Sequence, residues 1–369
     1  MFGALKTVSS GVLASCLACD VRAAVRLGYS LAAALLETRF ERAGSRIWLY
    51  GLFLCFLWMN GSVVLAHDEV SDMTRRQQGI LTGMPFMAHV SSRSFVDDAG
   101  RKMYLAKTPA RIVSLAPSVT EMLFAIGAGE QLVGVTDFCD YPPEASTKPK
   151  LGYAHPNLES LMALQPDLVL APQEFLKPDI ILKLEQLKVP VFILSATTVE
   201  DILGHLQTLG RMLDRSVQAN AIAMTLRQDV AAVRLRTQKV SPVRVLYVLN
   251  SQPLITVGPG SFIDQLLRIA GGTNVAAQSQ LPYPRLSLEV VLQQDPEVLL
   301  FPIGKAEGIP DSEQQTWRQW QTMTAVRRGR LHQIPADLLN RPGPRIGQAL
   351  TMLVNILHPE IAAGPSSQP

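Results

Sequence analysis

The sequence predicts an α/β protein of two lobes, each with a mainly parallel sheet, joined by one long rigid helix. Ser216 is expected to cap that helix, which runs to Lys239 without glycine or proline and repeats apolar residues at helical spacing, at Ile222, Leu226, Val230 and Val233. One Leu-Glu pair precedes this helix in the sequence and a second pair follows it. In both copies a proline follows the glutamate by seven residues, Glu159 to Pro166 and Glu289 to Pro296. This duplication predicts one matching unit in each lobe.

Length and composition exclude several classes of protein. The 369 residues leave room for two domains with sizeable cores, and the formal net charge of +3 is small for this length. No basic run suggests nucleic acid, and no acidic tail suggests a solvating segment. We therefore expect a globular protein that binds no nucleic acid.

The start of the chain predicts export. A continuous apolar run from Ile47 to Met59 follows three arginines and precedes the small residues of Val64-Leu65-Ala66. This order is typical of a secretory signal at about residues 46–66, and it places the mature protein in the periplasm. A retained N-terminal membrane anchor is the alternative. Residues 1–45 do not fit a signal, and a start codon assigned too far upstream is our hypothesis for them.

The mature protein would keep one cysteine, Cys139, so no disulfide framework is possible within one chain. A single cysteine without a partner motif is expected to be a small buried residue. We divide the chain into a signal region, a linker, an N-terminal lobe, connecting helices, a C-terminal lobe and a tail, at 1–66, 67–93, 94–197, 198–240, 241–360 and 361–369.

In the first lobe, alternating residues around Asp97 to Gly100 predict a hairpin. Short apolar runs and helical segments then alternate, which argues for a parallel sheet covered on both faces. The predicted strands are 111–115, 132–135, 168–171 and 191–194, and the predicted helices are 119–126 and 179–187.

Ligands of such sheets bind beyond the carboxyl ends of the strands. The loops expected there are aromatic and polar with little charge, which suits a large neutral or mixed ligand. They contain Ser118, Tyr141, Tyr153, His155, Gln173 and Phe175. For His155 the alternative is a solvent-exposed turn residue.

The second lobe repeats the alternation. Its predicted strands are 243–249, 254–257, 298–301 and 330–334, its helices are 262–269, 317–323 and 346–357, and a loop covers 337–345. Gly258 to Ser261 is interpreted as a turn with a helix cap, because the spacing of a phosphate-binding loop is absent. No catalytic motif is present, and the six histidines lack ligand spacing.

Several motifs together resemble one family. They are Arg111-Ile-Val-Ser-Leu-Ala-Pro-Ser-Val-Thr-Glu121, Asp140-Tyr-Pro-Pro143, Asn157-Leu-Glu159 and Pro166-Asp-Leu-Val169. Their order and spacing resemble the substrate-binding proteins of ABC importers, in the branch that carries cobalamin, haem and ferric siderophores. The resemblance covers about Phe95 to Glu360. It implies two Rossmann-like lobes on a helical backbone, which is the class III architecture of periplasmic binding proteins.

The resemblance also implies roles for individual residues. Glu159 and Glu289 match acidic residues that pair with arginines of the permease, one per lobe. The alternative is that each only favours the first turn of a helix. Tyr283 lies in a segment that resembles a ligand-facing loop, and Arg341 lies in one that resembles the family's late binding loop. For Arg341 a surface salt bridge is the alternative.

By the same resemblance the ligand is a corrinoid such as cobalamin. Tyr153 and Tyr283 stand where tryptophans stack on cobalamin in the most similar members. Haem is the second candidate, with an axial Tyr or His, and a ferric siderophore is the third. The partners implied are a permease dimer and its ATPase subunits, and the protein itself would be a monomer without a cofactor. An enzyme resembling tetrapyrrole metal chelatases is the alternative of another class.

Overall fold

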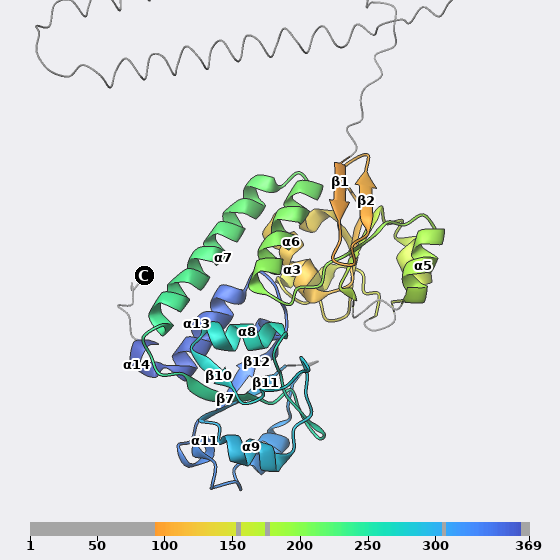
Figure 1. The fold of residues 1–369 in the computed structure, drawn as a ribbon. Coiled ribbons are helices and arrows are strands. Elements are labelled where there is room, and N and C mark those ends of the chain that lie inside the picture. The colour runs from red at the N-terminus through yellow and green to blue at the C-terminus, as the bar shows by residue number, and fades with distance from the viewer. Residues whose placement is uncertain (1–92, 153–155, 174–177, 305–307, 363–369) are drawn as a thin grey trace, which may run out of the picture. The chain divides into compact units, whose positions relative to one another are not determined.

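Both lobes are built on four-stranded parallel sheets in the computed structural model (Figure 1). The structure describes residues 93–152, 156–173, 178–304 and 308–362, and all of them fall within one unit, His89–Pro369. The expected signal at 46–66 and the alternative anchor lie outside the described residues. In the part of the chain that is described, no helix has the length and apolarity needed to cross a membrane.

The N-terminal sheet has the strand order β4-β3-β5-β6. Its strands are β3 (Ile112–Ser114), β4 (Leu132–Val135), β5 (Leu168–Ala171) and β6 (Val191–Ile193). An antiparallel hairpin of β1 (Arg93–Val96) and β2 (Lys102–Leu105) precedes it. In the hairpin turn Gly100 has a φ of +76°, a conformation that glycine adopts without strain. The predicted strands and hairpin are therefore confirmed.

Alternating side chains of these strands enter two different cores, as the two-residue period of a strand requires. Along β5, Leu168 and Leu170 join a core on the side of the connecting helices, and Val169 joins a separate core on the other side. The first face is covered by α3 (Pro117–Ala125) and α6 (Val199–Met212), and the second by α4 (Leu158–Ala163) and α5 (Pro178–Gln186). Two short 3-10 helices, η1 (Gly129–Gln131) and η2 (Pro143–Thr147), complete the lobe.

The C-terminal sheet has the order β10-β7-β11-β12. Its strands are β7 (Val243–Tyr247), β10 (Gly272–Asn274), β11 (Val298–Ile303) and β12 (Leu331–Pro335), and β8 (Asn250–Ser251) pairs with β9 (Leu254–Ile255) beside it. The inner face packs on α8 (Phe262–Ile269) and α13 (Ile346–Leu357). The outer face packs on α9 (Leu288–Gln294), α10 (Asp311–Trp317) and α11 (Thr324–Arg327). The short helices α12 (Ala336–Leu339) and α14 (Pro359–Ala362) follow β12 and α13.

The predicted long helix is confirmed as α7 (Ser216–Thr237), which is about 33 Å long at 1.5 Å per residue. Its N-terminal half packs against α6 and its C-terminal half against α13 and α8 (Figure 1). Its buried face consists of Ala219, Ala223, Leu226, Val230, Val233 and Thr237. One continuous hydrophobic core therefore runs from the N-terminal sheet through α7 to the C-terminal sheet.

Three details of the sequence prediction are wrong. Ser216 is not the cap of α7 but its first residue, and Arg215 at the cap position makes no side-chain cap bond. The helix predicted at 317–323 lies earlier, at α10, because Pro310 and the acidic residues after it begin the helix there. The segment 337–345 is not all loop, because Ala336 and Leu339 are buried on the short helix α12.

Candidate functional site

The two glutamates of the duplicated motif occupy equivalent positions. Glu159 is the second residue of α4 and Glu289 the second residue of α9, and both side chains are exposed. The caps of these helices are other residues, since Asn157 accepts a hydrogen bond from the Ser160 N–H at 2.9 Å and Ser287 accepts one from the Val290 N–H at 3.4 Å. A hydrogen bond from Ser287 lowers the pKa of Glu289, so its carboxylate is charged near neutral pH. Neither glutamate is therefore the residue that caps its helix.

Two predicted ligand residues lie on neighbouring loops of the N-terminal lobe. Ser118 is half-buried in the first turn of α3, directly after β3. Tyr141 follows β4, and 40% of its surface is exposed. Between these loops Cys139 is buried, with its Sγ 3.2 Å from the Thr120 hydroxyl and 3.0 Å from the Thr136 hydroxyl, which confirms it as a small buried residue. The exposed phenol and the serine hydroxyl are thus presented at the carboxyl end of the sheet.

The late loop of the C-terminal lobe reaches these N-terminal loops. Arg341 donates to the Asp140 carboxylate at 2.7 Å, to the Phe138 carbonyl at 3.1 Å and to Glu121 at 3.3 Å. Only 14% of its side chain is exposed. Arg341 therefore bridges the two lobes, and it stands beside the loop that carries Tyr141.

A second arginine makes a closer bridge. Arg345 donates to both oxygens of Glu121, from Nε at 2.8 Å and from Nη2 at 2.6 Å, and to Asp337 at 2.9 Å. Its guanidinium also lies over the Tyr141 ring, 4.1 Å from the ring centroid. Such a cation–π contact holds the phenol ring in one orientation.

The electrostatics of this cluster follow from its burial. The Glu121 side chain is only 1% exposed, and burial raises the pKa of its carboxyl, although hydrogen bonds and charges of Arg345 and Arg341 act in the opposite direction. Burial also raises the pKa of Asp140, but the hydrogen bond and charge of Arg341 outweigh it and leave that pKa lowered. The cluster combines three carboxyl groups and two guanidinium groups, so most of its charge is paired.

The other predicted site residues are not brought into this cluster by any contact described. Gln173 is exposed in the loop after β5, where its N–H donates to the Ser195 hydroxyl at 2.8 Å. Tyr283 is 55% exposed in the segment before α9. Tyr153, His155 and Phe175 lie outside the described residues. The ligand roles predicted for these five residues, like those of Ser118, Tyr141 and Arg341, stay predictions.

Sequence reasoning missed Glu121 and Arg345. Glu121 was named only as the last residue of the first family motif, and Arg345 was given no role. One signal was available, because Glu121 stands between Val119, Met122 and Leu123, which are all buried on α3. A charged residue that shares a buried helical face requires a partner of opposite charge.

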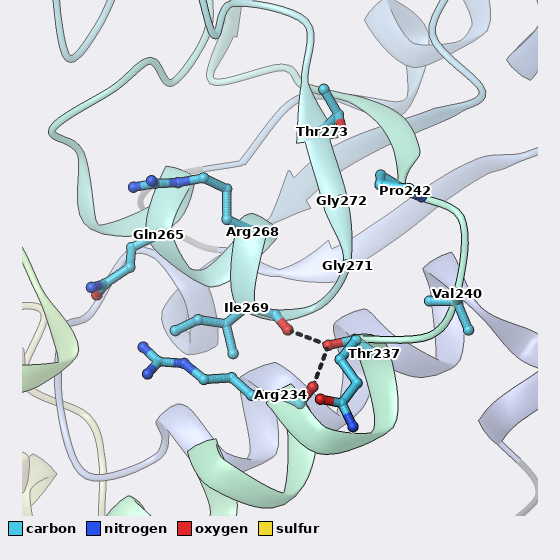
Figure 2. A pocket seen from close by; sticks show the side chains of 11 residues that line it. Arg234, Thr237, Val240, Pro242, Gln265, Arg268, Ile269, Gly271, Gly272 and Thr273 are labelled. Carbon is cyan, nitrogen blue, oxygen red and sulfur yellow. Dashed lines mark hydrogen bonds between the residues drawn. The ribbon is translucent and has the colours of Figure 1, made fainter.

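A distinct surface hollow of about 540 Å³ lies at the end of α7, and none of the predicted ligand residues lines it. Figure 2 shows Arg234, Gln265 and Arg268 extending to the same side of this hollow. The Thr237 hydroxyl donates to the Ile269 carbonyl at 3.0 Å and links α7 to α8 there. Both arginines have acidic neighbours, since Arg268 lies 3.0 Å from Asp264 and Arg234 lies 3.9 Å from Glu200.

Within the described ranges, no three His, Cys, Asp or Glu side chains are grouped so that they could hold a metal ion.

The two-lobed architecture with a helical backbone defines a class of solute-binding proteins. A model of the periplasmic binding protein family matches residues 112–338, which is more than half of the chain. The chain therefore belongs to the periplasmic binding protein family. The matched range begins with β3 and ends within α12, so it includes both sheets and the long helix.

Two relatives of this chain are vitamin B12-binding proteins by name. A vitamin B12-binding protein of Vibrio parahaemolyticus is 34% identical over 242 residues, which cover 65% of this chain and 86% of the relative. One of Pectobacterium atrosepticum is 31% identical over 265 residues, which cover 70% and 92%. The match thus includes most of the length of these relatives.

Solved structures give the same fold. The periplasmic vitamin B12-binding protein BtuF of Vibrio cholerae has a TM-score of 0.61 and 30% identity, and the match covers 69% of this chain and 98% of BtuF. The periplasmic haem-binding protein RhuT of Roseiflexus sp. RS-1 has a TM-score of 0.61 and 27% identity, with 68% and 98% covered. The predicted α/β class and the class III architecture are confirmed by these neighbours.

Proposed function

We propose that this protein is the periplasmic solute-binding component of an ABC importer and that it binds a corrinoid such as cobalamin between its two lobes. The observation that carries the proposal is the contact between loops of the two lobes, where Arg341 binds Asp140 beside Tyr141 and Gly343 lies beside Ser118. Relatives that align over most of their length are named vitamin B12-binding proteins, which supports a corrinoid over other ligands.

The proposed cycle needs no bond-making by this protein. A corrinoid enters between the lobes, where the Tyr141 ring and polar loop groups replace water on its surface. The loaded protein then docks on the permease, and an ATPase partner supplies the energy. Glu159 and Glu289 are suited to docking because they are exposed, lie one per lobe and are not the caps of their helices. A pseudo-symmetric pair of charges fits a permease dimer.

The first experiment is an equilibrium titration followed by visible absorption. Cyanocobalamin, and separately haemin, is added to protein purified from the periplasm. Saturable binding of cyanocobalamin with little response to haemin is the expected result. A shifted Soret band with haemin, and no cyanocobalamin binding, would refute the corrinoid proposal.

Haem is the second candidate, and it is favoured by one observation. Tyr141 and Tyr283 both present partly exposed phenols, and a phenolate can serve as an axial ligand to ferric iron. A structural neighbour, RhuT, is a haem-binding protein. Replacing Tyr141 or Tyr283 with Phe identifies the axial ligand, because loss of that ligand changes the haem spectrum whereas a stacking role tolerates Phe. A ferric siderophore is the ligand to test if neither tetrapyrrole binds.

The docking role has its own test. The double variant Glu159→Ala with Glu289→Ala is expected to bind ligand as the wild type does and to fail in uptake. The matched control replaces Glu144 and Glu313, one acidic residue per lobe, with Ala. Corrinoid-dependent growth of a strain lacking this protein is the measurement, and normal growth with the Glu159/Glu289 variant would exclude the docking role.

An enzyme of the chelatase type is the alternative from another class. Incubating the protein with a free porphyrin and ferrous or cobaltous ion distinguishes a chelatase from a solute-binding protein. Binding without metal insertion is expected from a solute-binding protein, whereas turnover would support the enzyme.

A further inference from the structure

One buried carboxylate of the N-terminal lobe holds two arginines of the C-terminal lobe. Glu121 accepts from Arg345 at 2.6 and 2.8 Å and from Arg341 at 3.3 Å, although it is separated from Arg345 by 224 positions in the chain. The exposed fractions of the three side chains are 1%, 11% and 14%. Water therefore has little access to these ion pairs.

These contacts depend on the separation of the lobes. Glu121 belongs to α3, which packs on the N-terminal sheet, whereas Arg341 and Arg345 belong to the loop between α12 and α13 of the other lobe. An outward movement of one lobe would break the hydrogen bonds between Glu121 and the two arginines, and charge-assisted hydrogen bonds of this kind are among the stronger ones in proteins. The cluster therefore favours one lobe separation over all larger ones.

The same contacts determine the geometry of the predicted binding loops. The Arg345 guanidinium lies over the Tyr141 ring, 4.1 Å from the ring centroid. Arg341 donates a hydrogen bond of 2.7 Å to the carboxylate of Asp140, the residue before that tyrosine. Glu121 binds both arginines and so fixes both contacts at once. On its own helix, Glu121 stands three residues after Ser118.

We propose that Glu121 is a positioning residue: it latches the two lobes together through Arg341 and Arg345 and thereby holds Tyr141 in its binding orientation before ligand arrives. This inference rests on the proposed function, because it assumes that ligand binds at the Tyr141 loop. The latch acts together with the long helix α7. The helix limits how far the lobes can separate, and the ion pairs select one separation within that range.

A preset separation should increase affinity, because less conformational freedom is then lost on binding. The apparent dissociation constant equals the intrinsic value divided by the fraction of molecules in the competent arrangement. If loss of the latch leaves about one molecule in ten in that arrangement, the dissociation constant rises about tenfold.

The first test measures lobe separation without any ligand. Spin labels are placed at Lys183→Cys on α5 and Ser312→Cys on α10, both exposed positions, in protein purified from the periplasm, where the remaining Cys139 is buried. Electron–electron resonance then gives the distribution of distances. Glu121→Gln, which keeps the size of the side chain but removes its charge, is expected to broaden this distribution to longer distances. The matched control Glu144→Gln, on the surface of the same lobe, should leave it unchanged.

A distribution with Glu121→Gln identical to that of the wild type would overturn the proposal. Arg341→Gln keeps the test decisive if the Glu121 variant does not fold, because this substitution removes a contact of the latch from the side of the other lobe. It should broaden the distribution as well. The double variant Glu121→Gln with Arg345→Gln should give a distribution no broader than Glu121→Gln alone, because both changes remove the same two hydrogen bonds. Independent, additive broadening would contradict a single latch.

The second test uses cyanocobalamin. Glu121→Gln should weaken its binding about tenfold, and Glu144→Gln should not change it. If the wild type binds no cyanocobalamin, the proposed ligand is wrong, but the distance measurement still decides whether the latch exists. If lobe separation changes while affinity does not, Glu121 joins the lobes without positioning the site, and the proposed positioning role is refuted.

Discussion

The contact between α6 and α7 predicts the effect of a single methyl group. Gly210 on α6 faces Ala219 on α7, and a Cβ at position 210 would lie 2.4 Å from the Ala219 Cβ and 3.2 Å from the Arg215 carbonyl oxygen. Gly210→Ala therefore forces the two helices apart where the chain enters its long helix. Both neighbours are backbone or Cβ atoms, so no side-chain rotation can relieve the overlap.

The magnitude follows from two opposing effects. Ordinary contacts of a Cβ begin near 3.4 Å, so the helices must separate by about 1 Å, and such overpacking costs about 1–3 kcal/mol. Alanine is better than glycine inside a helix by up to about 1 kcal/mol. The net loss of unfolding free energy is thus about 0–3 kcal/mol, which lowers the melting temperature of a protein of this size by up to about 12 °C.

Gly204→Ala is the matched control on the same helix. A Cβ at position 204 would meet no atom within 4 Å, so only the helix propensity changes. This control should raise the unfolding free energy by up to about 1 kcal/mol. Thermal unfolding followed by circular dichroism measures both variants. A Gly210→Ala protein as stable as Gly204→Ala would refute the argument from helix packing.

Two further predictions concern stability. Burial raises the pKa of Asp201, but hydrogen bonds from Thr197 and Thr198 outweigh this effect and leave the pKa lowered. The ionised Asp201 therefore stabilises α6 fully above the ordinary pKa of an aspartate, and this stabilisation is lost as the pH falls through the lowered pKa. Asp201→Asn should therefore cost about 1 kcal/mol near neutral pH, and its melting temperature should converge with that of the wild type as the pH falls below the lowered pKa of Asp201. Phe301 is 1% exposed and packs edge-on against Trp317, with ring centroids 6.1 Å apart. Phe301→Ala should lower the unfolding free energy by about 3–5 kcal/mol in urea titration, and the loss with Phe301→Leu should be smaller.

Much of the fold was predictable because its signals are local. The helix α8 was predicted with its observed bounds, since Ser261 caps its start and glycines follow its end. Strands such as β5 were predictable from short apolar runs between turn residues. The strand β10 was missed, because its three residues, Gly-Thr-Asn, carry no strand signal and form a strand only by pairing with β7.

The candidate site was predictable only in part. Ser118, Tyr141 and Arg341 were selected from loop positions and from the family resemblance. In the structure Arg341 binds Asp140, the residue before Tyr141, and Gly343 of the same late loop lies beside Ser118. The duplicated glutamates were found because a repeat can be seen in a sequence. Glu121 and Arg345 were missed, because the apolar neighbours of Glu121 indicate that it is buried but not which residue of the other lobe pairs with it.

The sequence by itself determined the alternation of strands and helices, the long uninterrupted helix and the repeated Leu-Glu motif with one copy per lobe. Each of these depends on interactions within a few residues or on a repeated motif. Only the tertiary structure decided that Glu121 meets Arg345 across 224 positions and that Arg345 covers Tyr141. The physical reason is that a buried ion pair between lobes exists only when both sheets and the helix between them are packed in place, and no short segment of the chain contains that geometry.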